Sequence, residues 1–142
     1  MQEICAVIAA GGLGTRLKNY KNNFSTKVLI EIGSKSMISS QVSQISSWGI
    51  KNFVIITNPD FDSMIKEDVT KNHPDKNIKF AIQEKPLGIA HALLQSEKLV
   101  ENYSKILFVL GDNFFGENPM LKLENQNIES MIFLKKVLNP NE

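Results

Sequence analysis

Short unbroken apolar runs alternate along this chain with segments of a different pattern. The runs have the length of buried strands, and we predict strands over 4–10, 53–57, 78–82, 106–110 and 131–138. Apolar residues at helical spacing predict helices over 36–48 and 88–100, and a third helix is expected from 58 to about 71. Continuous apolar strands that alternate with helices indicate an α/β fold, with a mostly parallel sheet that is covered on both faces.

A glycine-rich segment follows the first predicted strand, with Gly11, Gly12 and Gly14 ahead of Thr15 and Arg16. Glycine lets backbone N–H groups approach a ligand closely, and consecutive N–H groups can bind a phosphate. The segment lacks the Lys-Ser or Lys-Thr pair of a P-loop and the third glycine of the dinucleotide fingerprint. On the glycines alone, a phosphate-binding loop and a tight strand-to-helix turn are both open.

Two further segments follow predicted strands in the same way. Gln83 to Gly88 comes after the third strand, and Gly111-Asp112-Asn113 comes after the fourth. Ligands of open parallel sheets bind beyond the carboxyl ends of the strands, so the three segments are expected at one edge of the sheet. The Gln83 amide can both donate to and accept from the edge of a uracil or thymine ring. Asp112 is a candidate Mg²⁺ ligand, although Gly-Asp-Asn is also good turn chemistry.

These segments together carry a family resemblance. The string A-A-G-G-L-G-T-R-L at 9–17 closely resembles the signature of the sugar-1-phosphate nucleotidylyltransferases. That family also has a Q-x-x-P-x-G-x-A-x-A string, found here at 83–92, and a carboxylate after a buried strand, found here in V-L-G-D-N at 109–113. The family also has a lysine before a short apolar strand, and Lys27 stands at the matching place in this sequence. Within this family, the chain resembles the glucose-1-phosphate thymidylyltransferases.

The resemblance implies a Rossmann-like sheet of the type found in nucleotide-diphospho-sugar transferases, and a reaction. A nucleoside triphosphate, dTTP or UTP, would be joined to a sugar-1-phosphate with release of pyrophosphate. Arg16 and Lys27 are the implied catalytic residues, and Asp112 is the implied ligand of a Mg²⁺ cofactor. The implied nucleotide-binding residues are Ala10, Gly11, Gly12, Gly14, Thr15, Arg16, Gln83, Pro86, Gly88 and Asp112.

The family domain is longer than 142 residues, so the resemblance implies the N-terminal part of a single nucleotidyltransferase domain, apparently truncated. The sugar contacts and a second metal carboxylate would belong to the remainder, and full-length relatives are expected to be homo-oligomers. Two alternatives stay open. One is a nucleotide-binding fragment without turnover, and the other is a cytidylyltransferase that acts on a phosphate other than a sugar phosphate.

The balance of charged residues limits the kinds of partner that can be expected. Sixteen basic and fifteen acidic side chains leave a formal net charge of +1, which gives no electrostatic reason to expect nucleic acid or a membrane surface as a partner. No predicted segment has the length of a membrane span or the pattern of a signal peptide, so a cytoplasmic location is expected. We expect Cys5 to be a buried apolar residue, His73 to be solvated in a loop, and His91 to be structural or on the surface.

Overall fold

The computed structural model describes residues 4–12, 26–122 and 129–134. Its main sheet has four parallel strands in the order β5-β4-β1-β6. The strands are β1 (Ile4–Ala9), β4 (Asn52–Thr57), β5 (Asn77–Ile82) and β6 (Lys105–Leu110). The predicted parallel α/β fold is confirmed, and these four strands lie where the apolar runs placed them.

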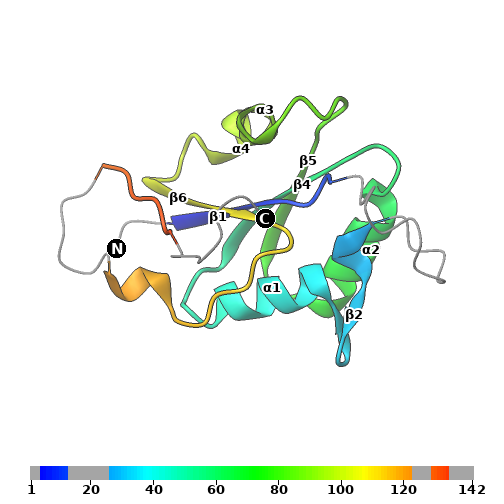
Figure 1. Cartoon of the computed structure of the whole chain (residues 1–142), viewed down its shortest axis with the longest axis horizontal. Helices are drawn as coiled ribbons and strands as arrows, with labels where there is room; N and C mark the ends of the chain where they lie inside the picture. The colour runs from blue at the N-terminus through cyan, green and yellow to red at the C-terminus, as the bar shows by residue number, and fades with distance from the viewer. Residues whose placement is uncertain (1–3, 13–25, 123–128, 135–142) are drawn as a thin grey trace, which may run out of the picture.

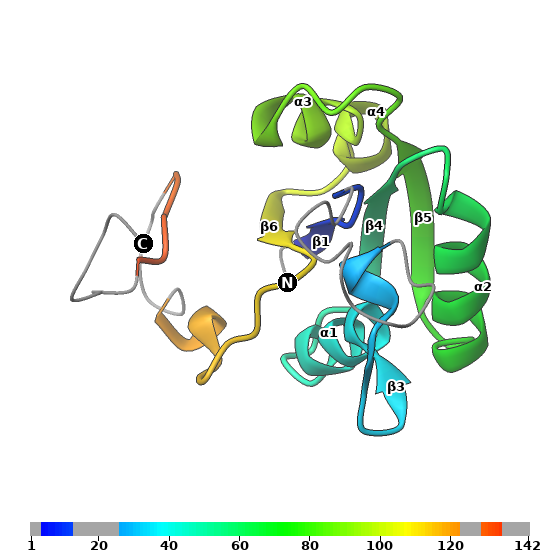
Figure 2. The same ribbon diagram turned by 45° about the vertical axis from the view of Figure 1, so that its right-hand side comes forward.

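Helices cover both faces of this sheet (Figures 1 and 2). The helices α1 (Met37–Ser46) and α2 (Asp62–Asn72) lie on one face, and α3 (Ile89–Leu94) and α4 (Glu97–Val100) lie on the other. Alternate residues of β1 therefore enter different cores: Ile8 packs on the α1 side, and Val7 packs on the α3 side. Burial on both faces explains why the strand is apolar throughout.

The connections create a switch in direction at the centre of the sheet. The chain passes from β1 to β4 and then to β5 by way of α1 and α2. It then returns through α3 and α4 to place β6 on the other side of β1. The connection that leaves β1 therefore runs over one face and the connection that enters β6 runs over the other, and open α/β sheets bind ligands where the connections change face in this way.

The predicted helix over 88–100 is in fact two short helices with a break at Gln95 and Ser96. The buried Ser96 hydroxyl donates to the carbonyl of Leu93 at 2.6 Å, and the Ser96 N–H bonds the same carbonyl at 3.0 Å. This tight turn redirects the chain, so the apolar stripe is not continuous. Ile89, which the stripe predicted to be buried, is 57% exposed.

The predicted strand over 131–138 is wrong where the structure describes it. Residues 131–134 form no strand, and Ile132 and Leu134 are strongly exposed. Figure 2 shows this orange-red segment away from the sheet. An apolar run becomes a strand only when it has a pairing partner, and residues 131–134 pair with no strand in the described part of the chain. Residues 135–138 lie outside the described residues, as does the polar segment 18–25, which the sequence predicted as a loop.

The remaining elements are small. A hairpin of β2 (Glu31–Ile32) and β3 (Lys35–Ser36) precedes α1, and it follows a single 3₁₀ turn, η2 (Lys27–Leu29). A second 3₁₀ turn, η3 (Pro119–Lys122), lies beyond β6. No helix within the described ranges is long and apolar enough to cross a bilayer.

Two isolated side chains test the predictions further. Cys5 is buried as predicted, and this burial raises the pKa of its thiol to about 11 although Lys79 opposes the shift, so the thiol is not a nucleophile. The expectation for His73 is wrong, because this residue is only 6% exposed. Its Nε2 lies 2.9 Å from the carbonyl oxygen of Ser39, which joins the end of α2 to α1.

Candidate nucleotide-binding site

A cavity of about 390 Å³ lies at the carboxyl ends of β1 and β6, where the connections switch direction. Most of the predicted site residues that the structure describes line this cavity: Gly11, Gly12, Lys27, Gln83, Pro86, Gly88 and Asp112. Ala10 lies beneath it, buried, with its N–H bonded to the carbonyl of Ile56 at 2.8 Å. Gly14, Thr15 and Arg16 lie outside the described residues. The three segments that the sequence placed at one edge therefore meet around a single cavity.

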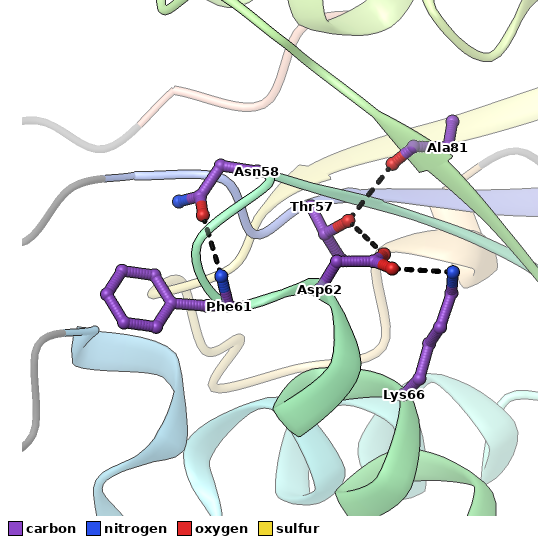
Figure 3. A network of polar contacts seen from close by, with 6 residues as sticks. All are labelled: Thr57, Asn58, Phe61, Asp62, Lys66 and Ala81. Atoms are coloured by element: carbon purple, nitrogen blue, oxygen red, sulfur yellow. Dashed lines mark hydrogen bonds and ion pairs between the residues drawn. The ribbon is translucent and has the colours of Figure 1, made fainter.

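The loop after β1 is held by Asn58, which the sequence did not mark as a site residue. This side chain is 5% exposed, and its Nδ2 donates to the carbonyl of Gly11 at 3.0 Å. Its Oδ1 accepts from the N–H of Phe61 at 3.0 Å, as Figure 3 shows. Asn58 thus ties the start of the glycine-rich segment to the end of β4. A polar residue directly after a buried strand was the signal that could have identified it.

A second network fixes the end of β4 against α2 (Figure 3). The Thr57 hydroxyl donates to Asp62 Oδ1 at 2.6 Å, while the carbonyl of Ala81 is farther from it at 3.3 Å. Lys66 Nζ lies 2.6 Å from Asp62 Oδ2. Burial raises the pKa of Asp62, but the hydrogen bonds from Lys66 and Thr57 outweigh it, so the pKa lies below its usual value. The carboxylate therefore stays ionised and holds this corner of the sheet together.

The loop after β5 carries Gln83, the candidate residue for recognising the nucleotide base. The N–H of Gln83 bonds the carbonyl of Thr57 at 2.9 Å, which continues the sheet pairing past the end of β5. Gln83 is 8% exposed, and its Nε2 lies 3.1 Å from the carbonyl oxygen of Gly88 and 3.0 Å from His91 Nδ1. Gly88 has φ 100° and ψ 178°, a conformation that is essentially restricted to glycine. His91 is half-buried and contacts a candidate site residue.

Two opposite charges meet at the β1–β6 side of the cavity. Lys27 Nζ and Asp112 Oδ2 are 2.9 Å apart, and both side chains are partly exposed. Lys27 begins the η2 turn and Asp112 follows β6, so the pair joins segments that are 85 residues apart. The ammonium group could bind a phosphate, and the carboxylate could bind a cation.

The loop that carries Asp112 is held in place by α1. Gln41 is fully buried, and its Nε2 donates to the carbonyls of Leu110 and Asn113 at 2.8 and 2.6 Å. Gln44 forms a reciprocal pair with the backbone of Phe115, at 2.7 and 3.2 Å. Sequence reasoning missed both glutamines. The available signal was a polar residue, Gln41, beside the apolar stripe of α1.

Gly111 allows this loop to lie against the end of β1. A Cβ at Gly111 would be 3.0 Å from the carbonyl oxygen of Ala9 and 3.0 Å from Val28 Cγ1. Both distances are shorter than normal contacts, and one neighbour is rigid backbone. The N–H of Gly111 also bonds the Ala9 carbonyl at 2.8 Å. A side chain here would push Asp112 away from the cavity.

The side chains available as metal ligands limit which metal ion the cavity could bind. In the described part of the chain, no three His, Cys, Asp or Glu side chains gather into a cluster. Among the described residues that line the cavity, Asp112 is the one that carries a carboxylate, and Lys27 lies beside it. One protein carboxylate together with phosphate oxygens and water suits Mg²⁺, which is seldom bound by an all-protein cage.

Comparison with known proteins identifies the family. The model of the nucleotidyl transferase family matches residues 5–141, and the chain belongs to this family. It is 31% identical to a mannose-1-phosphate guanyltransferase of Yarrowia lipolytica over 96% of its length, and 32% identical to the bifunctional protein GlmU of Buchnera aphidicola over 99%. It is also 31% identical to a glucose-1-phosphate thymidylyltransferase of Neisseria meningitidis over 94% of its length.

Solved structures agree with this family and with the fold. A Bacillus anthracis protein assigned as a glucose-1-phosphate thymidylyltransferase matches 85% of the chain with a TM-score of 0.75 and 27% identity. HddC of Yersinia pseudotuberculosis, complexed with GMP-PN, matches 79% with a TM-score of 0.65 and 27% identity. The chain covers 49% and 48% of these two structures. It covers 39%, 29% and 48% of the three relatives named above, less than half of each.

Proposed function

We propose that this chain is the nucleotide-binding part of a sugar-phosphate nucleotidylyltransferase that transfers a nucleotidyl group from dTTP or UTP to a sugar-1-phosphate. The carrying observation is that Lys27, Gln83 and Asp112, from three distant segments, line one cavity at the switch point of the sheet. The site offers a cation, a carboxylate and an amide, which suit a phosphate, a metal ion and a base respectively. We place all 142 residues in the N-terminal part of one domain.

The proposed reaction is a single displacement at phosphorus. An oxygen of the sugar-1-phosphate attacks the α-phosphorus of the triphosphate, a new P–O bond forms, and the bond to the pyrophosphate oxygen breaks. The attacking oxygen is already anionic, so the protein does not need a general base. Catalysis then consists of positioning and of stabilising negative charge.

Each proposed role follows from the chemistry of the side chain. Arg16 and the N–H groups of the glycine-rich segment bind the triphosphate, and Lys27 neutralises phosphate charge. Asp112 fits Mg²⁺ because its carboxylate is accessible at the cavity. When bound, the ion supplies further neutralisation of the phosphate oxygens. Ala10, Gly11 and Gly12 shape the phosphate side, and Pro86 and Gly88 shape the base side.

The choice of base rests on Gln83. Gln83 lines the cavity from the loop after β5, whereas Asp112 lines it from the loop after β6, and these two strands are at opposite margins of the sheet. The relatives carry names for guanyl and thymidylyl transfer, so they support a nucleotide without fixing the base. We assign dTTP or UTP because a glutamine amide can pair with the edge of a uracil or thymine ring.

Calorimetry tests the nucleotide assignment. The chain is titrated with dTTP, UTP, CTP, ATP and GTP, each with Mg²⁺. We expect dTTP or UTP to bind most tightly, and equal or tighter binding of ATP or GTP would contradict the assignment. Arg16→Ala should weaken binding by about ten- to a hundredfold, since a hydrogen bond to a charged group is worth about 1.5–3 kcal/mol.

Lys71→Ala is a matched control for Arg16→Ala. It also removes one positive charge, but at an exposed site on α2. Circular dichroism should be unchanged in both variants. A change below about threefold for Arg16→Ala would remove Arg16 from the proposed site.

Binding and turnover are separate parts of the proposal. The chain covers less than half of its named relatives, so we assign nucleotide binding to these 142 residues and expect little pyrophosphate release from them alone. A pyrophosphate assay with dTTP or UTP and a sugar-1-phosphate measures this. Rapid release would show that these residues hold a complete catalytic site.

A further inference from the structure

The Gln83 amide has an orientation that its neighbours determine. Its Nε2 lies 3.1 Å from the carbonyl oxygen of Gly88. A carbonyl oxygen only accepts hydrogen bonds, so the amide group that faces it must be the NH₂ and not the oxygen. One hydrogen of Nε2 is therefore committed to Gly88, and the second points elsewhere.

The second hydrogen faces His91. Gln83 Nε2 and His91 Nδ1 are 3.0 Å apart, so Nδ1 must be the acceptor and the imidazole proton must be on Nε2. Gln95 Nε2 donates to the His91 carbonyl at 3.0 Å and lies 3.4 Å from His91 Nε2, but a neutral imidazole can accept at only one of its two nitrogens. The shorter contact with Gln83 therefore decides the tautomer.

Both hydrogens of the Gln83 amide are now used within the protein. Only Oε1 is left for a ligand, and no hydrogen bond to it is found from the described residues. Gln83 lines the cavity and is fixed at the end of β5 by its own N–H. A bound base therefore meets a hydrogen-bond acceptor at this position.

We propose that His91 is a positioning residue that makes Gln83 an acceptor-only reader of the base. Uracil and thymine carry a hydrogen on N3, whereas N3 of cytosine is a bare acceptor. An acceptor fixed at this position favours uracil or thymine over cytosine, although the rings have nearly the same shape. This inference rests on the proposed function, because it deepens the role of Gln83 in that site.

The tautomer of His91 can be measured without any nucleotide. Long-range ¹H–¹⁵N spectra of the labelled chain at about pH 8 report which imidazole nitrogen carries the proton. We expect the Nε2–H form for His91, with its signals assigned by their loss in His91→Asn. An Nδ1–H form would overturn the proposal. If the wild-type chain bound no nucleotide, the proposed function would fail while this measurement still decided the positioning role.

Two variants test the effect on selectivity. His91→Leu removes the acceptor, and His91→Asn keeps an acceptor oxygen near the place of Nδ1. We expect His91→Leu to lower the preference for UTP over CTP by about three- to tenfold, which corresponds to one ordinary hydrogen bond. We expect His91→Asn to keep most of the preference.

Inorganic tripolyphosphate separates selectivity from general damage. It should bind wild type and both variants within about twofold, because it has no base. A merely structural role for His91 would lower the binding of UTP, CTP and tripolyphosphate together. An unchanged UTP to CTP ratio in a folded His91→Leu chain would overturn the proposal. If this variant does not fold, the tautomer of the wild-type chain still decides it.

Discussion

The two faces of the sheet differ in how completely the helices that cover them are buried. On the α1–α2 face, Ile38, Val42, Ile45, Ile65 and Val69 are completely buried. On the α3–α4 face, the only fully buried apolar residue contributed by the two helices is Ala92, among described residues. Ile89 and Leu94 of α3 are more than half exposed.

The polar contacts follow the same division. Ser36, at the N-cap of α1, and Ser39, on α1, both donate to Asp68 of α2, at 2.5 and 2.7 Å. Gln41 of α1 donates to the loop of Asp112. On the other face, the polar contacts centre on His91. The heavily packed face thus anchors the charged groups proposed for phosphate and metal. The lightly packed face carries the proposed base reader, where side chains can change at a lower cost in stability.

The largest expected difference between the faces is in core packing. Ile38→Ala, on the buried face, should lower the free energy of unfolding by about 2–5 kcal/mol because it leaves a cavity. Leu93→Ala, on the α3 face, should cost less than about 2 kcal/mol because Leu93 is only partly buried. Urea unfolding of both variants measures the two costs. Equal costs would mean that the faces do not differ in this way.

Polar anchoring gives the next largest expected effect. Gln41→Leu removes the side-chain hydrogen bonds to the carbonyls of Leu110 and Asn113, although Leu110 keeps a bond from the N–H of Asn113 at 3.1 Å. A typical hydrogen bond contributes about 0.5–1.5 kcal/mol. The variant should also bind Mg²⁺ and triphosphate more weakly, because the Asp112 loop loses its support. Gln95→Leu is the counterpart on the other face, and it should change stability by less than about 0.5 kcal/mol. Calorimetry and urea unfolding together would show whether only the first variant affects both properties.

The pH dependence of stability sharpens the comparison through His73. Burial lowers the pKa of this imidazole, while the bond to Ser39 opposes the shift. His73 therefore binds a proton more readily in the unfolded state than in the folded state. Its neutral form contributes to the stability of the fold in full above the ordinary pKa of 6.5, and this stability is lost as the pH falls below that value. Unfolding measured from about pH 8 to 5 should show this loss, and His73→Gln should reduce it. A wild-type profile that matches the variant would contradict a buried neutral imidazole.

The smallest effect is expected for a surface ion pair. Lys66→Met removes the partner of Asp62 one turn away on α2, where Lys66 is 42% exposed. Pairs of this kind contribute about 0.3–0.5 kcal/mol. Unfolding in low and high salt should show a small cost that salt removes. A cost above about 1.5 kcal/mol would indicate that the pair supports the corner formed by Thr57.

The sequence predicted those parts of the fold that depend on burial alone. The four strands are apolar throughout because both of their faces are covered, and this pattern is visible without a structure. The break at Ser96 and the burial of His73 involve hydrogen bonds to the backbone carbonyls of Leu93 and Ser39, which hydrophobic spacing does not record. The segment 131–134 has the composition of a strand, but it lacks a partner in the described sheet.

The candidate site also contains residues whose place could be predicted from the sequence and residues whose place could not. The position of Gln83 and Asp112 at one cavity could be predicted because each comes shortly after a strand, and the topology brings the strand ends together. Asn58 and Gln41 could not, since each acts by bonding the backbone of another segment. The ion pair of Lys27 with Asp112 could not be predicted either, because the two residues meet only where η2 lies against the loop after β6.

The position of β6 at the margin of the sheet has a consequence for how the longer relatives could be completed. In the described part of the chain β6 pairs only with β1, so its other side still offers hydrogen bonds to a further strand. Asp112 follows the end of that same strand by two residues. A polypeptide segment that added itself there would cover the open margin and would bring its own side chains next to Asp112. A strand that extended the sheet would then also extend the candidate site.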